Sequence, residues 1–156
     1  RRDLTQAPLP VLTASLADRR EALAAQGADD PMLQPARDVA GADLILIGAP
    51  YWDLSFPAAL KIYLEWASVL GITFHYTDQG VQEGLCRAEH LVYITTAGGM
   101  IGEKNLGFDY LRGLGEMFGI HNAHFLSAQG LDIWGNDSQA LLDQAMEQAR
   151  LLAGRI

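Results

Sequence analysis

The segment Asp43–Pro50, with the sequence DLILIGAP, decides the predicted fold. Leu44, Ile45, Leu46 and Ile47 follow one another without a polar residue between them. A strand with one face in water alternates apolar and polar residues, whereas a parallel strand covered on both faces is apolar throughout. The segment therefore predicts a strand that is buried on both faces in a parallel sheet.

Two further apolar segments predict strands of the same sheet. HLVYITTAGG repeats the unbroken pattern from Leu91 to Thr96 and ends in Gly98-Gly99. HFLSAQG, from His124 to Gly130, is a weaker example. A fourth strand is predicted only as a stub near Asp3 and Leu4, before a turn that contains two prolines.

Helical periodicity fills the intervals between these strands. The predicted helices cover residues 11–25, 30–40, 55–70, 108–118 and 138–152. Asp30-Pro31 is a typical helix start, and Pro57 is tolerated in a first turn. Strands that alternate with helices predict a doubly wound α/β sheet, here as a single domain over residues 1–156. Residues 71–85 interrupt this alternation and predict a small hairpin or ordered loop that turns at residues 78–80.

Composition excludes several classes of partner. The net charge of −8 argues against nucleic acid, because phosphate binding requires a basic surface. The longest apolar stretch, Leu44 to Trp52, is too short for a membrane helix. The single cysteine, Cys86, allows no internal disulfide, and is either a small apolar filler or a nucleophile. We expect a cytoplasmic protein without a membrane segment. We also expect no metal site, because the four histidines lack the spacing of metal ligands.

The candidate site follows from the direction of the strands. In an open α/β sheet, ligands bind beyond the carboxyl ends of the strands. Two loops follow such ends, the aromatic segment 50–55 and the glycine-rich segment 97–105, AGGMIGEKN. Glycine lets backbone N–H groups approach a ligand closely. An aromatic wall opposite a glycine wall suits a planar ring system.

Each of these features also has a purely structural interpretation. Gly98-Gly99 is consistent with a simple turn after a strand. Tyr51 and Trp52 are consistent with core aromatics that cover the end of the sheet. Asp53 is consistent with a charge that interacts with the N-terminus of the following helix. The residues alone leave these alternatives open.

With both loops located, the chain resembles the flavodoxin-like NAD(P)H dehydrogenase (quinone)/FMN-dependent NADH-azoreductase family. The resemblance covers most of residues 41–130. It is carried by the segments APYWDLSFPAALKIYLEW, GITFHYTDQGVQEGL, YITTAGG, YLRGLGEMFGI and SAQG, which occur in the order and at the spacing of the family.

The resemblance implies that FMN binds between the two loops. The cofactor-binding residues that it implies are Pro50, Tyr51, Trp52, Asp53 and Leu54 on one side, and Thr96, Ala97, Gly98, Gly99 and Met100 on the other. It also implies ping-pong hydride transfer from NADH or NADPH to a quinone or azo compound, without a catalytic acid or base from the chain. The family is usually a homodimer with the flavin near the interface, which makes Tyr76 a candidate substrate contact, or else a packed hairpin residue.

Some features differ from the family pattern. Asp53 stands where many azoreductases carry Asn, Ala97 stands where a polar residue such as Arg often occurs, and Met100-Ile101 replaces the Ile-His of some members. A carboxylate near the flavin disfavours an anionic reduced ring. The family's first strand, phosphate loop and first helix are expected ahead of Arg1, so the chain as given is expected to be an N-terminally incomplete flavodoxin-like domain.

Three functions follow as hypotheses. The leading one is an FMN-dependent NAD(P)H oxidoreductase that reduces quinones or azo compounds. The second is a flavodoxin-type electron carrier or flavin-binding module without turnover. The third is a non-catalytic, partner-binding α/β domain.

Overall fold

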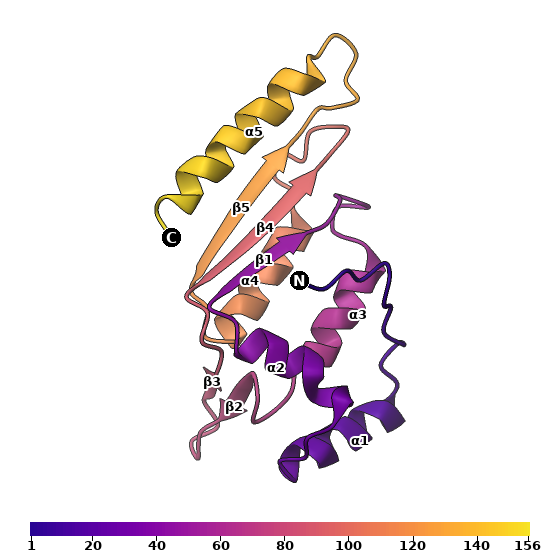
Figure 1. Cartoon of the computed structure of the whole chain (residues 1–156), viewed down its shortest axis with the longest axis vertical. Helices are drawn as coiled ribbons and strands as arrows, with labels where there is room; N and C mark the ends of the chain where they lie inside the picture. Colours follow the sequence, from indigo (N-terminus) through magenta and orange to yellow (C-terminus); the bar gives the residue numbers. More distant parts are fainter.

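A three-stranded parallel sheet forms the centre of the computed structural model, which describes residues 1–156. Its strands are β1 (Leu44–Gly48), β4 (His90–Thr96) and β5 (Asn122–Ala128), in the order β1-β4-β5. The predicted parallel α/β sheet is thus confirmed. All three carboxyl ends lie at the same edge of the sheet, at the upper end in Figure 1.

The chain contains five α-helices. They are α1 (Ala14–Ala25), α2 (Gln34–Ala40, which follows a 3₁₀ turn at Pro31–Leu33), α3 (Ala58–Ala67), α4 (Leu106–Met117) and α5 (Ser138–Ala153). Helix α5 lies against β5 on one face, whereas α2, α3 and α4 contribute to the main apolar core on the other (Figure 1). None of the helices has the length and hydropathy that a membrane span requires.

Polar caps set where two helices start. The Asp30 carboxylate accepts a 2.8 Å hydrogen bond from Met32 N, so the predicted Asp30-Pro31 start is confirmed. Helix α1 begins three residues later than predicted, because the Thr13 hydroxyl accepts a hydrogen bond from Leu16 N. The predicted helix at residues 55–70 is shorter at both ends and begins only after Pro57.

The segment between α3 and β4 forms the predicted hairpin. Strands β2 (Phe74–Tyr76) and β3 (Gln82–Gly84) pair antiparallel. The turn closes with a 2.8 Å hydrogen bond from Gly80 N to Thr77 O. The hairpin lies beyond the amino end of the sheet, away from the carboxyl ends of the strands (Figure 1).

Two sequence predictions are wrong. Residues 3–4 form no strand, because the Asp3 carboxylate accepts hydrogen bonds from the Thr5 backbone N–H at 3.0 Å and from its hydroxyl at 2.7 Å, which closes a turn. Strand β1 is not covered on both faces, since Leu46 is 61% exposed and Leu44 is also exposed. The reason is its place at the edge of the sheet, where α5 covers β5 instead.

Candidate functional site

The aromatic segment after β1 is a tight two-residue turn, which we call the aromatic turn (residues 50–55). Trp52 and Ser55 exchange both backbone hydrogen bonds, at 3.0 and 2.8 Å. The central residues Asp53 and Leu54 have φ values of 49° and 67°. Such φ values favour glycine or asparagine, and a leucine there is strained. The conformation therefore depends on contacts from outside the turn.

The segment after β4 presents a row of backbone donors, and we call residues 97–101 the glycine loop. The carbonyl groups of Ala97, Gly98 and Gly99 accept hydrogen bonds of 3.2, 2.9 and 3.0 Å from the backbone N–H groups of residues 131, 132 and 130. The N–H groups of Gly98, Gly99 and Met100 make no hydrogen bond within the chain. With the carbonyls held on one side, these three donors are available to a ligand.

Hydrogen bonds join the aromatic turn to the chain that follows β4. Tyr51 N donates to Thr96 O at 3.1 Å, and the Tyr51 hydroxyl donates to Lys104 O at 2.7 Å. Leu106 N, at the start of α4, donates to Leu54 O at 3.1 Å. The prediction that these two loops meet at one edge of the sheet is therefore confirmed.

The predicted site residues differ in exposure. Trp52 is 60% exposed and Met100 is 69% exposed, so neither is a core residue. Tyr51 is half-buried, and Ala97 is buried under the loop. The other predicted residues, Pro50, Asp53, Leu54, Thr96 and Gly99, are exposed, and Gly98 is intermediate. The core interpretation thus fails for Trp52.

The structural interpretation of Asp53 also changes. Asp53 lies at the tip of the aromatic turn, and α3 begins only at Ala58. Its exposed carboxylate makes no hydrogen bond to the start of the helix, which begins without any side-chain cap. Aspartate tolerates the left-handed conformation better than most residues, and this accounts for its presence in the turn.

Two residues after β5 complete the edge of the sheet and were not predicted. A Cβ atom at Gly98 would lie 2.1 Å from Oδ2 of Asp132, so a larger residue there requires the Asp132 side chain to move. Gln129 accepts a hydrogen bond from Ile101 N at 2.9 Å. The signal for both residues was the carboxyl end of the third predicted strand, which must lie at the same edge as the other two.

Tyr76, the predicted substrate contact, lies elsewhere. It is an exposed residue of β2, and its ring meets that of Phe74 edge-on at a centroid distance of 5.9 Å. The hairpin lies beyond the opposite end of the sheet from the glycine loop (Figure 1). Tyr76 is therefore not brought together with the other predicted site residues of the same chain.

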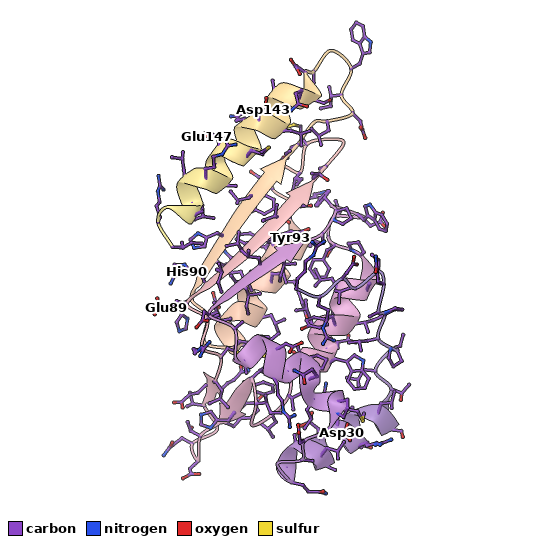
Figure 2. All side chains as sticks on the ribbon, in the orientation of Figure 1. Asp30, Glu89, His90, Tyr93, Asp143 and Glu147 are labelled. Carbon is purple, nitrogen blue, oxygen red and sulfur yellow. The ribbon has the colours of Figure 1, made fainter.

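Tyr93 lies within β4, below the carboxyl edge of the sheet (Figure 2). Its side chain is fully buried, and its ring packs against Phe56 and Phe125 at centroid distances of 6.4 and 5.7 Å. The hydroxyl is buried without a hydrogen-bond partner, and burial raises the pKa of Tyr93. The phenol is thus neutral and serves as an apolar support.

The histidines do not form a metal centre. His90, at the amino end of β4 (Figure 2), lies beside His124 of β5, with 3.0 Å between Nδ1 of His90 and Nε2 of His124. No three His, Cys, Asp or Glu side chains lie close enough together to hold a metal ion. Burial and the neighbouring His90 both lower the pKa of His124.

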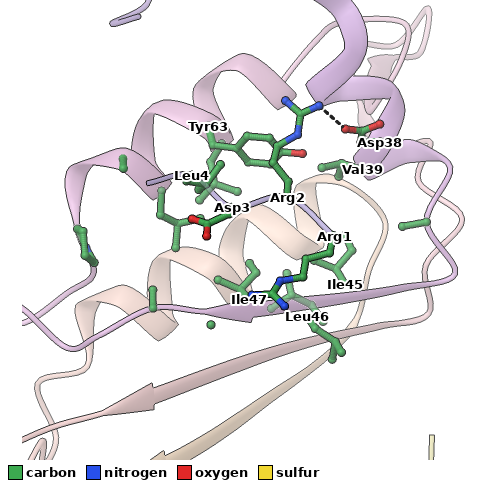
Figure 3. A pocket seen from close by; sticks show the side chains of 18 of the residues that line it. Arg1, Arg2, Asp3, Leu4, Asp38, Val39, Ile45, Leu46, Ile47 and Tyr63 are labelled. Carbon is green, nitrogen blue, oxygen red and sulfur yellow. Dashed lines mark hydrogen bonds and ion pairs between the residues drawn. The ribbon is translucent and has the colours of Figure 1, made fainter. Parts of the chain in front are cut away.

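A cavity of about 910 Å³ forms a groove along the open side of β1. The first residues of the chain cross it, and Arg2 forms a 2.9 Å ion pair with Asp38 (Figure 3). The Arg2 guanidinium also lies 5.6 Å from the centre of the Tyr63 ring. The floor of the groove is apolar and includes Ile47 and Leu60. The groove reaches the aromatic turn at Pro50 but does not include the glycine loop.

Known proteins resemble the chain in sequence. It is 38% identical over 130 residues to the FMN-dependent NADH:quinone oxidoreductase 2 of Clostridium acetobutylicum, covering 80% of this chain and 64% of that protein. It is 39% identical over 122 residues to the FMN-dependent NADH:quinone oxidoreductase of Clostridium beijerinckii, covering 77% and 61%. The chain thus spans somewhat less than two thirds of the length of these relatives.

Solved structures resemble it in fold. The azoreductase of Bacillus anthracis strain Sterne superposes with a TM-score of 0.81 at 22% identity, over 99% of this chain and 80% of that one. An FMN-dependent NADH-azoreductase of Bacillus anthracis strain Ames Ancestor, in complex with FMN, gives a TM-score of 0.76 at 19% identity, over 99% and 79%. The family of proteins with a flavodoxin-like fold matches residues 1–152, and the chain belongs to this family.

Proposed function

We propose that the protein is an FMN-dependent NAD(P)H oxidoreductase that reduces quinones or azo compounds. The observation that carries this proposal is the meeting of the aromatic turn and the glycine loop, with three free N–H groups, at the carboxyl edge of the sheet. The names of the relatives, FMN-dependent NADH:quinone oxidoreductases, support the same cofactor, donor and acceptor.

The residues at this edge fit a flat heterocycle. The N–H groups of Gly98, Gly99 and Met100 would donate to the carbonyl oxygens and the N1 or N5 atoms of an isoalloxazine, which accept hydrogen bonds. A Cβ atom added at Gly99 would meet nothing within 4 Å, so the loop leaves room for a ring to approach its backbone. Residues 50–54 would hold the ring on one side and residues 96–100 on the other. When bound, FMN supplies the hydride and electron transfer.

The chain itself contributes binding and orientation. The glycine loop places three donors in a row, and the strained aromatic turn presents the exposed Trp52 side chain at the same edge of the sheet. No side chain of the site is assigned as a general acid or base. The Asp53 carboxylate disfavours negative charge on a ring bound nearby, so it is expected to lower the flavin potential relative to asparagine.

The remaining parts of the proposal concern the assembly. The open edge of β1, with its apolar groove, suits a further parallel strand. We assign this edge position to the first strand of the family fold, which the resemblance also links to the phosphate loop.

In a homodimer, Tyr76 of one subunit would contact substrate at the site of the other. A cytoplasmic location fits the single half-buried Cys86.

Flavin content and turnover of the complete protein test this proposal. We expect a yellow protein that binds one FMN per chain and oxidises NADH steadily with a quinone acceptor. A flavodoxin-type carrier would bind FMN but show almost no NADH oxidation. A protein that stays colourless after addition of FMN would contradict the cofactor assignment.

Two exposed tryptophans provide a matched comparison. Trp52 lies in the aromatic turn, whereas Trp134, which is 99% exposed, lies on the loop after β5. Trp52→Ala should raise the FMN dissociation constant by about ten-fold, because it removes about 1–2 kcal/mol of ring contact. Trp134→Ala should leave it within about two-fold of the parent value. Equal effects of the two substitutions would contradict the placement of the ring.

A further inference from the structure

Gln129, the first residue after β5, links the glycine loop to the sheet through its side chain. Its Oε1 atom accepts a 2.9 Å hydrogen bond from Ile101 N, and its Nε2 atom donates a 2.7 Å hydrogen bond to Ser127 Oγ. Because a backbone N–H can only donate, the amide oxygen of Gln129 must face Ile101. The half-buried side chain is therefore held in one orientation by two partners.

The two ends of the glycine loop are held in different ways. At the first end, the carbonyls of Ala97, Gly98 and Gly99 are bonded to the backbone of residues 130–132. At the second end, neither Met100 nor Ile101 makes a hydrogen bond with another backbone group. Among the N–H groups of residues 98–101, only that of Ile101 has a partner in the chain, and this partner is Gln129. The second end thus depends on Gln129 and on the buried Ile101 side chain.

We propose that Gln129 is a positioning residue, which fixes the Met100 end of the donor row so that all three free N–H groups face one flat ligand edge. This inference rests on the proposed FMN site and goes beyond it, because Gln129 acts through the backbone of Ile101 rather than on the ring. Donors that are fixed before binding cost no ordering free energy when the ligand arrives. Loss of Gln129 leaves the loop formed but its second end mobile.

Amide hydrogen exchange of the flavin-free protein tests the link directly. Gln129→Met has a similar length and removes both hydrogen bonds, so the Ile101 amide should exchange about ten-fold faster or more. Gln129→Glu keeps an acceptor for Ile101 N and for the Ser127 hydroxyl, so exchange should stay within about two-fold of the parent. Ser127→Ala, a second variant, releases only the far side of Gln129 and should give an intermediate increase. The control is Gln139→Met, on the exposed surface of α5, which should change nothing at Ile101.

FMN titration of the same variants of the complete protein gives the second readout. Gln129→Met should raise the dissociation constant by about five-fold or more, while Gln139→Met stays within about two-fold of the parent. A parent protein that binds no FMN would overturn the proposed function. Hydrogen exchange at Ile101 would then be the only test of the link to Gln129, and equal exchange in Gln129→Met and the parent would overturn that link. A parent that binds FMN, together with a Gln129→Met variant whose Ile101 exchange and FMN affinity both match the parent, would overturn the role of Gln129.

Discussion

The Tyr51 hydroxyl donates a 2.7 Å hydrogen bond to the backbone carbonyl of Lys104, 53 positions later in the chain. This bond joins the aromatic turn to the loop that leads into α4. The backbone bond from Tyr51 N to Thr96 O lies beside it. Tyr51 thus links the aromatic turn to the chain on both sides of the glycine loop.

Tyr51→Phe should therefore weaken the connection between the aromatic turn and the loop before α4 without unfolding the protein. A hydrogen bond of this kind contributes about 1 kcal/mol, so the free energy of unfolding should fall by roughly that amount. Urea denaturation measures this change, and FMN affinity should fall with it. Tyr76→Phe is the control for stability alone, because the Tyr76 ring is exposed and contacts Phe74 edge-on without a hydrogen bond from its hydroxyl. Equal stability of the two variants would contradict the role of the Tyr51 hydroxyl.

The strain at Leu54 predicts a substitution that increases stability. A left-handed conformation costs a non-glycine residue about 1–2 kcal/mol, and glycine gives back part of this through its larger unfolded-state entropy. Leu54→Gly should raise the free energy of unfolding by about 0.5–1 kcal/mol. Leu85 has the same 43% exposure and no positive φ, so Leu85→Gly should lower it. Destabilisation by both substitutions would show that the turn is not strained.

Tyr93→Phe tests the buried hydroxyl that has no partner. Removal of a buried polar atom that makes no hydrogen bond is neutral or favourable. The variant should equal or exceed the parent in urea midpoint, in contrast to Tyr51→Phe. A loss of about 1 kcal/mol or more would mean that the Tyr93 hydroxyl makes a hydrogen bond in solution.

Much of this fold could be predicted because its signals are local. The apolar runs of β1 and β4, the Asp30-Pro31 helix start and the turn at residues 78–80 each indicate one structure from neighbouring residues alone. The meeting of the two loops followed from the rule that parallel strands end at one edge. These features need no knowledge of distant contacts.

The remaining features depend on distant contacts. The sequence from Asp53 to Ser55 lacks the Asn-Gly signal of a two-residue turn, so helical periodicity extended the predicted α3 to Ser55. Contacts from distant residues stabilise the turn, among them the hydrogen bond from Leu106 N to Leu54 O. The exposure of Leu46 depends on which strands and helices lie beside β1. The Gln129 link is likewise a contact between two loops.

The His90–His124 pair predicts a dependence of stability on pH. Burial first, and His90 second, lower the pKa of His124 below its usual 6.5. The unfolded state then binds the proton more tightly than the folded state. The contribution of His124 to the free energy of unfolding is therefore complete above about pH 6.5 and decreases as the pH falls through the lowered pKa. Melting temperatures at about pH 7.5 and pH 5 should differ less in His124→Gln than in the parent. His121→Gln is the control, and an unchanged pH dependence in His124→Gln would contradict the assignment.

The central claim is that FMN lies against the free N–H groups of the glycine loop, and one pair of valine substitutions tests it most directly. A Cβ atom at Gly99 or at Gly113 meets nothing within 4 Å, but only Gly99 is in the glycine loop. Both variants of the complete protein should fold, because the added Cβ atom meets no neighbour at either position. FMN titration should give a dissociation constant at least about ten-fold higher for Gly99→Val than for the parent, and one within about two-fold for Gly113→Val. A folded Gly99→Val variant that binds FMN as tightly as Gly113→Val would contradict the account.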